Sequence, residues 1–279
     1  MATLARERLL PVPPAAEAPT WWTMARVLEH RALQYRRTFR ASIFGSFVTP
    51  ALFLTAMGVG LGAYVNQGAT AALGGASYLQ FLAPGLLAAS LMQTASFESM
   101  FPILGGLQWN RIFHAMYATP IRPRDIAFGN IAWIVLRLTL VGTVFAAVIV
   151  AFGAATSPLI VLAVPAAVLT GMAFSTPIIA FSATQRRPDT FSSIFRFGIT
   201  PLFLFSGTFF PISNLPPIIQ PIAWLSPLWH GVDLCRALML GTIGADPLLA
   251  LIHVAVLSTI AVVGARVAVH TMTARLVRG

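Results

Sequence analysis

Apolar segments long enough to cross a lipid bilayer recur along this chain, and they constrain its fold more than any other feature. Six are predicted, and they cover residues 43–65, 78–107, 126–152, 158–183, 194–210 and 248–269. A helix rises about 1.5 Å per residue, so about 20 residues cross a hydrocarbon core of about 30 Å. The fifth segment is only just long enough. The sequence therefore predicts an all-α membrane protein with six transmembrane helices, its membrane domain covering residues 43–279.

The composition agrees with this class. The 279 residues are 57% hydrophobic and only 9% charged, so too few polar side chains exist to cover a soluble domain. Prolines inside the apolar segments, such as Pro84 and Pro177, are tolerated in membrane helices when neighbouring groups satisfy the freed backbone. We expect a multi-pass protein of the plasma (inner) membrane, with membrane lipids as its surroundings.

The connections between the segments alternate in charge. The net charge is +10, and every basic residue is arginine. Arginine-bearing connections precede the first segment, follow the second and fourth, and form the C-terminal tail, whereas the first and third connections carry no charge. By the positive-inside rule, both termini are predicted to be cytoplasmic. Because the arginines follow this topology, their charge is not taken as a sign of nucleic-acid binding.

Several functions are excluded by missing residues. The chain has no lysine, which a Walker A phosphate loop requires, so we expect it not to be an ATPase; ATP and Mg²⁺ would be bound by a partner chain. The single Cys235 excludes an internal disulfide and a cysteine-rich metal site. No metal-ligand spacing, nucleophile–base arrangement or proton relay is recognisable. Residues 1–20 have no signal-peptide core and are expected to form a flexible cytoplasmic tail.

Residues 21–42 form a predicted amphipathic helix. Its apolar face is made by Trp21, Ala25, Leu28, Ala32, Tyr35 and Phe39, with Arg26, Glu29, His30, Arg37 and Arg40 lying away from it. Such a helix lies in the cytoplasmic interface of the membrane. It is either a positive-inside anchor alone or, in addition, a contact for a cytoplasmic partner.

The connection at 108–129 mixes aromatic and basic residues. Residues 110–117 are predicted to form two helical turns with Ile112, Phe113 and Met116 on one side, and Pro120 and Pro123 to break the helix. Asp125 is expected to cap the following helix. A short helix projecting from two long spans is a lever for a cytoplasmic partner. The alternative is a solvated loop.

The stretch 209–236 is apolar but broken by Pro211, Pro216, Pro217, Pro221 and Pro227. Two short helices, at about 215–225 and 228–240, are predicted to dip into the outer leaflet and return. Backbone of this kind is tolerated only where it is buried in protein or lines a cavity, so the segment would plug the extracellular end. Asp233 and Arg236, at positions i and i+3, are expected to pair at the surface.

Glu98 and Arg137 fall inside predicted spans, where an unpaired charge costs at least about 2.5 kcal/mol. Both lie at similar depth from the cytoplasmic face, so we predict that they pair. The alternative is that either lines a substrate path. His253, in the last span, is interpreted as a hydrogen-bonded packing residue.

Taken together, these features resemble the permease subunits of ABC-2 type exporters. The more specific parts are SFES around Glu98, HAMYATPIRPRDIAFGN at 114–130 and FLFSGTFFPISNLPPIIQPIAWLSPLWHGVDLCRALMLG at 203–241. The nearest branch includes the nodulation lipo-oligosaccharide exporters and the daunorubicin-type drug exporters. The resemblance covers nearly the whole chain.

The resemblance implies a role for each region. The ATPase-coupling residues would be Arg111, Phe113, His114, Met116, Tyr117, Pro120, Arg122, Arg124 and Asp125. The extracellular gate would comprise Phe210, Pro211, Leu215, Pro216, Trp224, Pro227, Trp229, His230, Asp233 and Arg236. The implied partners are an ABC ATP-binding subunit and a second permease subunit. The implied substrate is lipid-linked, a glycolipid or an amphipathic drug. The alternatives are a membrane scaffold without a transport path and a proton-coupled carrier.

Overall fold

The computed structural model describes residues 19–67, 73 and 75–278, and this part of the chain is helical without strands. All but the last two residues of the predicted tail at 1–20 lie outside it. The helices are α1 (Thr20–Phe53), η1 (Leu54–Leu61), α2 (Gly62–Val65), α3 (Tyr78–Leu104), η3 (Gly105–Trp109), α4 (Ile112–Tyr117), α5 (Pro123–Ala151), α6 (Ile160–Thr184), α7 (Asp189–Ile194), η4 (Phe195–Ile199), α8 (Thr200–Phe205), η5 (Ile212–Asn214), α9 (Gln220–Leu225), α10 (Pro227–Leu240) and α11 (Pro247–Arg278).

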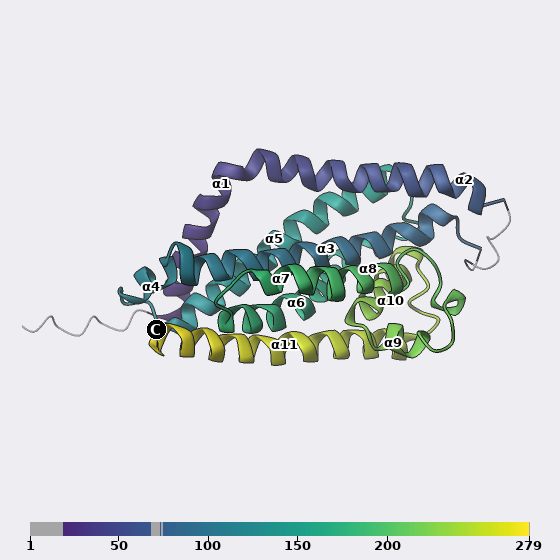
Figure 1. Cartoon of the computed structure of the whole chain (residues 1–279). Helices are drawn as coiled ribbons and strands as arrows, with labels where there is room; N and C mark the ends of the chain where they lie inside the picture. Colours follow the sequence, from purple (N-terminus) through teal and green to yellow (C-terminus); the bar gives the residue numbers. More distant parts are fainter. Residues whose placement is uncertain (1–18, 68–72, 74, 279) are drawn as a thin grey trace, which may run out of the picture.

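Helix α6 is the centre of the bundle. It packs against α3, α5, α10 and α11, while α1 packs mainly on α5. Figure 1 shows α1 along one side of the bundle and α11 along the opposite side. The short helix α4 and the C-terminus lie at one end, and α2 and α9 lie at the other. The two ends are therefore built from different elements.

Small residues let neighbouring helices approach α6 closely. A Cβ atom at Gly264 of α11 would lie 2.8 Å from Cδ of Pro177 in α6, and one at Gly231 of α10 would collide with Thr170. Helices in lipid gain little from the hydrophobic effect, so close van der Waals packing of this kind holds them together. Thr176 adds a polar contact, because its hydroxyl donates to the Ala261 carbonyl of α11 at 2.9 Å.

The predicted amphipathic helix and first span are one continuous helix. Figure 1 shows the first part of α1 crossing the end of the bundle near α4 before the helix bends to run along the bundle. In this first part, Val27 and Thr23 are buried against the protein, whereas Trp21 is 71% exposed. The predicted apolar face therefore points away from the bundle at Trp21, where an interfacial helix would meet lipid. Of the polar residues predicted for this helix, Arg40 has its side chain outside the described part.

Four described helices are long and apolar enough to cross a membrane: Val48–Val65, Pro123–Ala151, Ile160–Thr184 and Pro247–Arg278. The second predicted span is the long helix α3, which lies largely buried in the bundle and carries polar residues such as Gln93 and Glu98. The fifth predicted span is assembled from three short consecutive helices, α7, η4 and α8, and ends at Phe205 rather than residue 210. The chain is thus an all-helical integral membrane protein with several candidate spans.

We predict that Gly264→Ala weakens the α6–α11 contact. The added methyl group would meet backbone and ring atoms of Pro177 that cannot move aside, at a cost of about 1–3 kcal/mol in the free energy of unfolding. The measurement is thermal unfolding of the purified protein in detergent. Gly244→Ala is the control, since nothing lies within 4 Å of a Cβ there. Equal unfolding temperatures for both variants would contradict the packing argument.

Candidate functional site

The short helix α4 is anchored in the bundle by Phe113. The side chain of Phe113 is 1% exposed, and a Cβ atom at Gly106 would lie 2.5 Å from its ring. Glycine at 106 is thus needed for the ring to fit. As one of the predicted coupling residues, Phe113 is not free to meet a partner directly, because its ring is already covered by this chain.

The break after α4 is as predicted, whereas the helix begins at Ile112 rather than at residue 110. The helix ends at Tyr117, and α5 begins at Pro123, with Arg122 in the extended conformation that a following proline favours. Before α4, Arg111 adopts a left-handed backbone conformation with φ 47°, which turns the chain out of η3.

Other predicted coupling residues do lie at the surface. Tyr117 is 41% exposed, and Arg111, Pro120 and Arg124 are exposed as well; His114, Met116 and Arg122 are partly buried. Sequence reasoning missed Trp109, which is 58% exposed just before this segment. A tryptophan two residues before an arginine, at the end of an apolar run, is the signal that would have indicated it.

Asp125 lies inside the protein rather than on the predicted coupling surface. Its carboxylate is fully buried and accepts a hydrogen bond of 2.7 Å from the Thr23 hydroxyl of α1. The expectation that Asp125 caps α5 is corrected, since Asp125 lies in the first turn of α5, the N-cap is Arg122, and the Asp125 carboxylate accepts from Thr23 of α1. A negative charge in the first turn still favours the helix dipole.

A second polar contact joins α1 to α5 nearby. Arg31 donates from Nε to the Asn130 side-chain oxygen at 2.9 Å, and its guanidinium lies 5.6 Å from the Phe113 ring centre. Arg31 therefore connects α1, α4 and α5. We name the contacts of Thr23 with Asp125 and of Arg31 with Asn130 the α1–α5 joint. The sequence did not reveal it, because its partners are about 100 residues apart.

The predicted pairing of Glu98 with Arg137 is confirmed. Nε of Arg137 lies 3.6 Å from Oε1 of Glu98, and their side chains are 11% and 21% exposed, respectively. The guanidinium also lies 4.2 Å from the ring centre of Tyr35 in α1. This pair links α3 and α5 and brings α1 to the same place.

At the opposite end, the predicted break at Pro227 is confirmed and the helix bounds are corrected. Helix α9 begins at Gln220, later than predicted, since a 3-10 turn at Ile212–Asn214 and an irregular stretch precede it. Helix α10 begins at Pro227, and the Ser226 hydroxyl accepts a hydrogen bond from the Leu228 amide. Of the predicted gate residues, Leu215 and His230 are buried, Phe210, Pro211, Pro227 and Trp229 are partly buried, and Pro216 and Trp224 are exposed.

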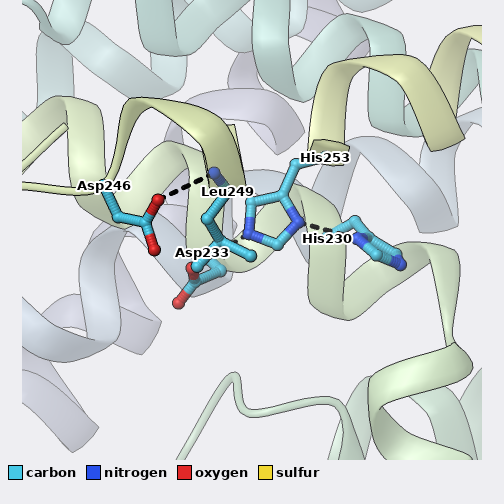
Figure 2. Close-up of polar contacts among 5 residues, drawn as sticks. All are labelled: His230, Asp233, Asp246, Leu249 and His253. Carbon is cyan, nitrogen blue, oxygen red and sulfur yellow. Dashed lines mark hydrogen bonds and ion pairs between the residues drawn. The ribbon is translucent and has the colours of Figure 1, made fainter. Parts of the chain in front are cut away.

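Asp233 and Arg236 do not form the predicted surface pair. Figure 2 shows Asp233 beside His253, whose Nε2 lies 3.1 Å from Oδ2 of Asp233. Burial raises the pKa of Asp233, but the hydrogen bond with His253 and the charge of Arg236 outweigh it and hold that pKa below its ordinary value. Since Nε2 of His253 donates to the carboxylate, Nδ1 of a neutral imidazole accepts from Nδ1 of His230, at 2.7 Å. His253 is the hydrogen-bonded packing residue that was expected.

Arg236 instead holds α10 against two other elements. It donates to the Gly207 carbonyl at 2.9 Å and to the Phe81 carbonyl at 3.3 Å, and its guanidinium lies 3.9 Å from the Phe81 ring centre. Asp233 and Arg236 lie one turn apart on α10, yet they do not pair with each other. Asp233 bonds to His253 of α11, and Arg236 bonds to the Phe81 carbonyl of α3. The predicted outer segment is therefore fastened to α3, to the turn after α8 and to α11.

An apolar cavity of about 610 Å³ lies next to this segment. It is bounded by η1 and α2 on one side and by α8 and the following turn on the other. Phe53, Met57, Phe203 and Phe209 are among its lining residues, together with the predicted gate residues Phe210 and Pro211. Such walls suit an apolar or amphipathic molecule. Among the described residues, no group of three or more His, Cys, Asp or Glu side chains is placed to hold a metal ion.

Comparison with known proteins places this architecture in context. The family model described as "ABC-2 type transporter" matches residues 25–240. "Nodulation protein J" of Rhizobium leguminosarum bv. viciae is 33% identical over 246 residues, which are 88% of this chain and 92% of that protein. "Nodulation protein J" of Sinorhizobium fredii is 31% identical, with 91% and 94% of the two chains covered. "Inner membrane transport permease YadH" of Escherichia coli is 23% identical, with 79% and 84% covered.

We predict that Glu98→Gln alone and Arg137→Leu alone each lower the free energy of unfolding by about 2.5 kcal/mol, because each leaves a charge without its partner. The double variant should recover part of that loss. Unfolding of the four proteins in detergent, compared as a double-mutant cycle, measures the coupling. If the two losses simply add, the ion pair contributes nothing.

Proposed function

Because this chain belongs to the ABC-2 type transporter family, we propose that it is the permease subunit of an ATP-driven exporter in the plasma membrane. The family supplies the membrane component of a transporter, which is not itself an ATPase and which works with an ATP-binding subunit. In our proposal two permease subunits, identical or paralogous, assemble with ATP-binding subunits that hold ATP and Mg²⁺. The proposal includes six spans, counting α3 and the α7–η4–α8 segment.

The observation that carries this proposal is how α4 is built into the bundle. Phe113 ties α4 to η3, and Arg31 ties the same region to α1 and α5. A force applied to the exposed side of α4 is therefore transmitted through existing contacts to α3, which η3 continues, and to α1 and α5. A solvated loop would not have a buried aromatic anchor or the α1–α5 joint beside it.

The outer end supports export of an amphipathic molecule. The apolar cavity opens beside the segment that Arg236 fastens to α3 and to the turn after α8. We propose that α9 and α10 form an extracellular re-entrant cap over the substrate path. The resemblance of the sequence to the branch that includes the nodulation lipo-oligosaccharide exporters favours a lipid-linked or glycolipid substrate over a small polar one, and proteins named "Nodulation protein J" are among those similar to this chain.

Two other functions are weighed against export. A scaffold subunit would need no path, and a proton-coupled carrier would need no ATPase. Co-purification with an ATP-binding subunit, and stimulation of its ATPase activity by this chain, separates the exporter from both. ATP-dependent efflux of a fluorescent lipid from vesicles then tests transport directly. ATPase association without efflux favours the scaffold.

For the orientation, we predict that cysteines at exposed positions label from opposite sides. In a Cys235→Ser background, Ser213→Cys and Ala245→Cys should react with a membrane-impermeant maleimide from outside the cell. Thr119→Cys and Thr184→Cys should react only after the membrane is opened. All four positions are exposed in the structure, so poor reactivity would not come from burial. Labelling of Thr119→Cys from outside would contradict the six-span topology.

For coupling, we predict that Tyr117→Ala weakens association with the ATP-binding subunit about tenfold, since exposed aromatic residues are frequent hot spots of interfaces. Tyr64→Ala is the matched control, because Tyr64 is also exposed but lies in α2 at the opposite end. Association is measured by pull-down, and export is measured on the same membranes. Wild-type association and export in Tyr117→Ala would exclude α4 as the coupling surface.

A further inference from the structure

A basic cavity opens at the end of the bundle that carries α4. Its volume is about 490 Å³, and it is lined by Leu107, Gln108, Arg111, His114, Arg186 and Arg275. The lining residues come from η3, the start of α4, the connection after α6 and the last turns of α11. Three segments that are distant in sequence, residues 107–114, the connection after α6 and the end of α11, thus bring three arginines and a histidine around one space.

No carboxylate of the described chain neutralises these arginines. None of the ion pairs within 4.0 Å among the described residues involves Arg111, Arg186 or Arg275, and no acidic residue lines the cavity. His114 is the remaining polar side chain of the same lining besides Gln108. The cavity therefore presents positive charge without a counter-charge, which favours an anion.

The backbone is strained at this cavity. Arg111, with φ 47° and ψ 26°, is the one non-glycine residue of the described chain with positive φ. Left-handed backbone is unfavourable for an arginine, and such strain concentrates at functional sites. Here it accompanies the sharp turn from η3 into α4 and places Arg111 on the wall of the cavity.

The position of the cavity indicates the source of the anion. Trp109, which is 58% exposed, lies between the lining residues Gln108 and Arg111, and exposed tryptophan is typical of headgroup depth. Leu107 gives the cavity a buried apolar wall. A site with arginine forks and an apolar wall at this depth suits the phosphate of a lipid headgroup better than a fully solvated ion.

We infer that the basic cavity binds the phosphate group of an anionic phospholipid of the cytoplasmic leaflet. The lipid phosphate bridges the η3–α4 segment, the connection after α6 and the end of α11. Between the first two, Gln108 of η3 donates to the Gln185 carbonyl at 3.3 Å, near the limit of a hydrogen bond. The inference shares with the proposed function the cytoplasmic orientation of α4 and two of the predicted coupling residues, Arg111 and His114. It requires neither ATP hydrolysis nor export, so the two fail independently.

The test is lipid binding to the full-length protein in detergent, counted by native mass spectrometry during titration with phosphatidylglycerol and, separately, phosphatidylcholine. We expect one phosphatidylglycerol site with at least about tenfold higher affinity than for phosphatidylcholine, because charge-assisted hydrogen bonds of arginine are lost with a neutral or shielded headgroup. Arg111→Gln/Arg275→Gln should abolish this preference. Arg187→Gln/Arg278→Gln removes the same charge from arginines that do not line the cavity, and it should keep the preference.

A further variant separates binding from folding. Arg111→Gly removes the guanidinium while suiting the left-handed backbone, so it should lose lipid binding without losing thermal stability. If Arg111→Gln/Arg275→Gln and the control Arg187→Gln/Arg278→Gln lose the preference for phosphatidylglycerol equally, the site is overturned. The effect would then come from general surface charge. Unchanged lipid binding in Arg111→Gly and in Arg111→Gln/Arg275→Gln would overturn it as well.

Two more outcomes identify another occupant. Displacement of phosphatidylglycerol by equimolar glycerol 3-phosphate, which has no acyl chains, would assign the cavity to a soluble phosphate and overturn the lipid assignment. Loss of ATPase pull-down in Arg111→Gln/Arg275→Gln with an unchanged lipid count would assign the arginines to an acidic surface of the partner protein. Lipid loss with intact pull-down supports the inference.

Discussion

Close packing around α6 is the interaction on which the rest of this structure depends. In a bilayer the lipid is as apolar as the helix surfaces, so helices associate through backbone approach and polar contacts rather than through the hydrophobic effect. Gly231 and Gly264 allow α10 and α11 to reach α6, and the Thr176 hydroxyl bonds across the second of these contacts. The helix in the centre can therefore hold its neighbours at fixed positions while α1 remains at the side.

Polar contacts between helices lie at several positions along the length of the bundle. The α1–α5 joint, made by Thr23 with Asp125 and by Arg31 with Asn130, lies near α4. The pair of Glu98 and Arg137 joins α3 to α5 further along these helices. The contacts of Arg236 fix the opposite end. Because the α1–α5 joint is the set of polar contacts beside α4, a movement of α4 would displace α1 and α5 before the other helices. This order suits a permease in which a cytoplasmic partner acts at one end and a substrate leaves at the other.

The burial of Phe113 fixes α4 to the bundle and leaves other side chains of this region exposed. The exposed faces of Tyr117 and Trp109 are available to a partner, while Phe113 locks the same helix into η3. The basic cavity beside it adds a site where the membrane itself can act on α4. Coupling and lipid binding would then share one structural element, and the lipid composition of the inner leaflet would tune how firmly α4 is held.

The sequence alone determined the class of this protein and much of its layout. Long apolar segments have only one stable backbone form in lipid, and prolines break helices locally, so an all-helical protein with several long apolar helices, the break after α4 and the break at Pro227 were predictable. The pairing of Glu98 with Arg137 was predictable too, because an unpaired charge in lipid is so costly that two charges at equal depth have few other choices.

Only the tertiary structure decided which side chains meet across long sequence separations. The pattern of α4 did not show that Phe113 faces inward, since an aromatic residue on a short helix fits a core or an interface equally well. Asp233 and Arg236 satisfied a local pairing rule, yet His253 and the Phe81 and Gly207 carbonyls provided closer partners. Helical spacing shows which residues share a face, but the identity of the helix opposite that face depends on packing that one-dimensional patterns do not contain.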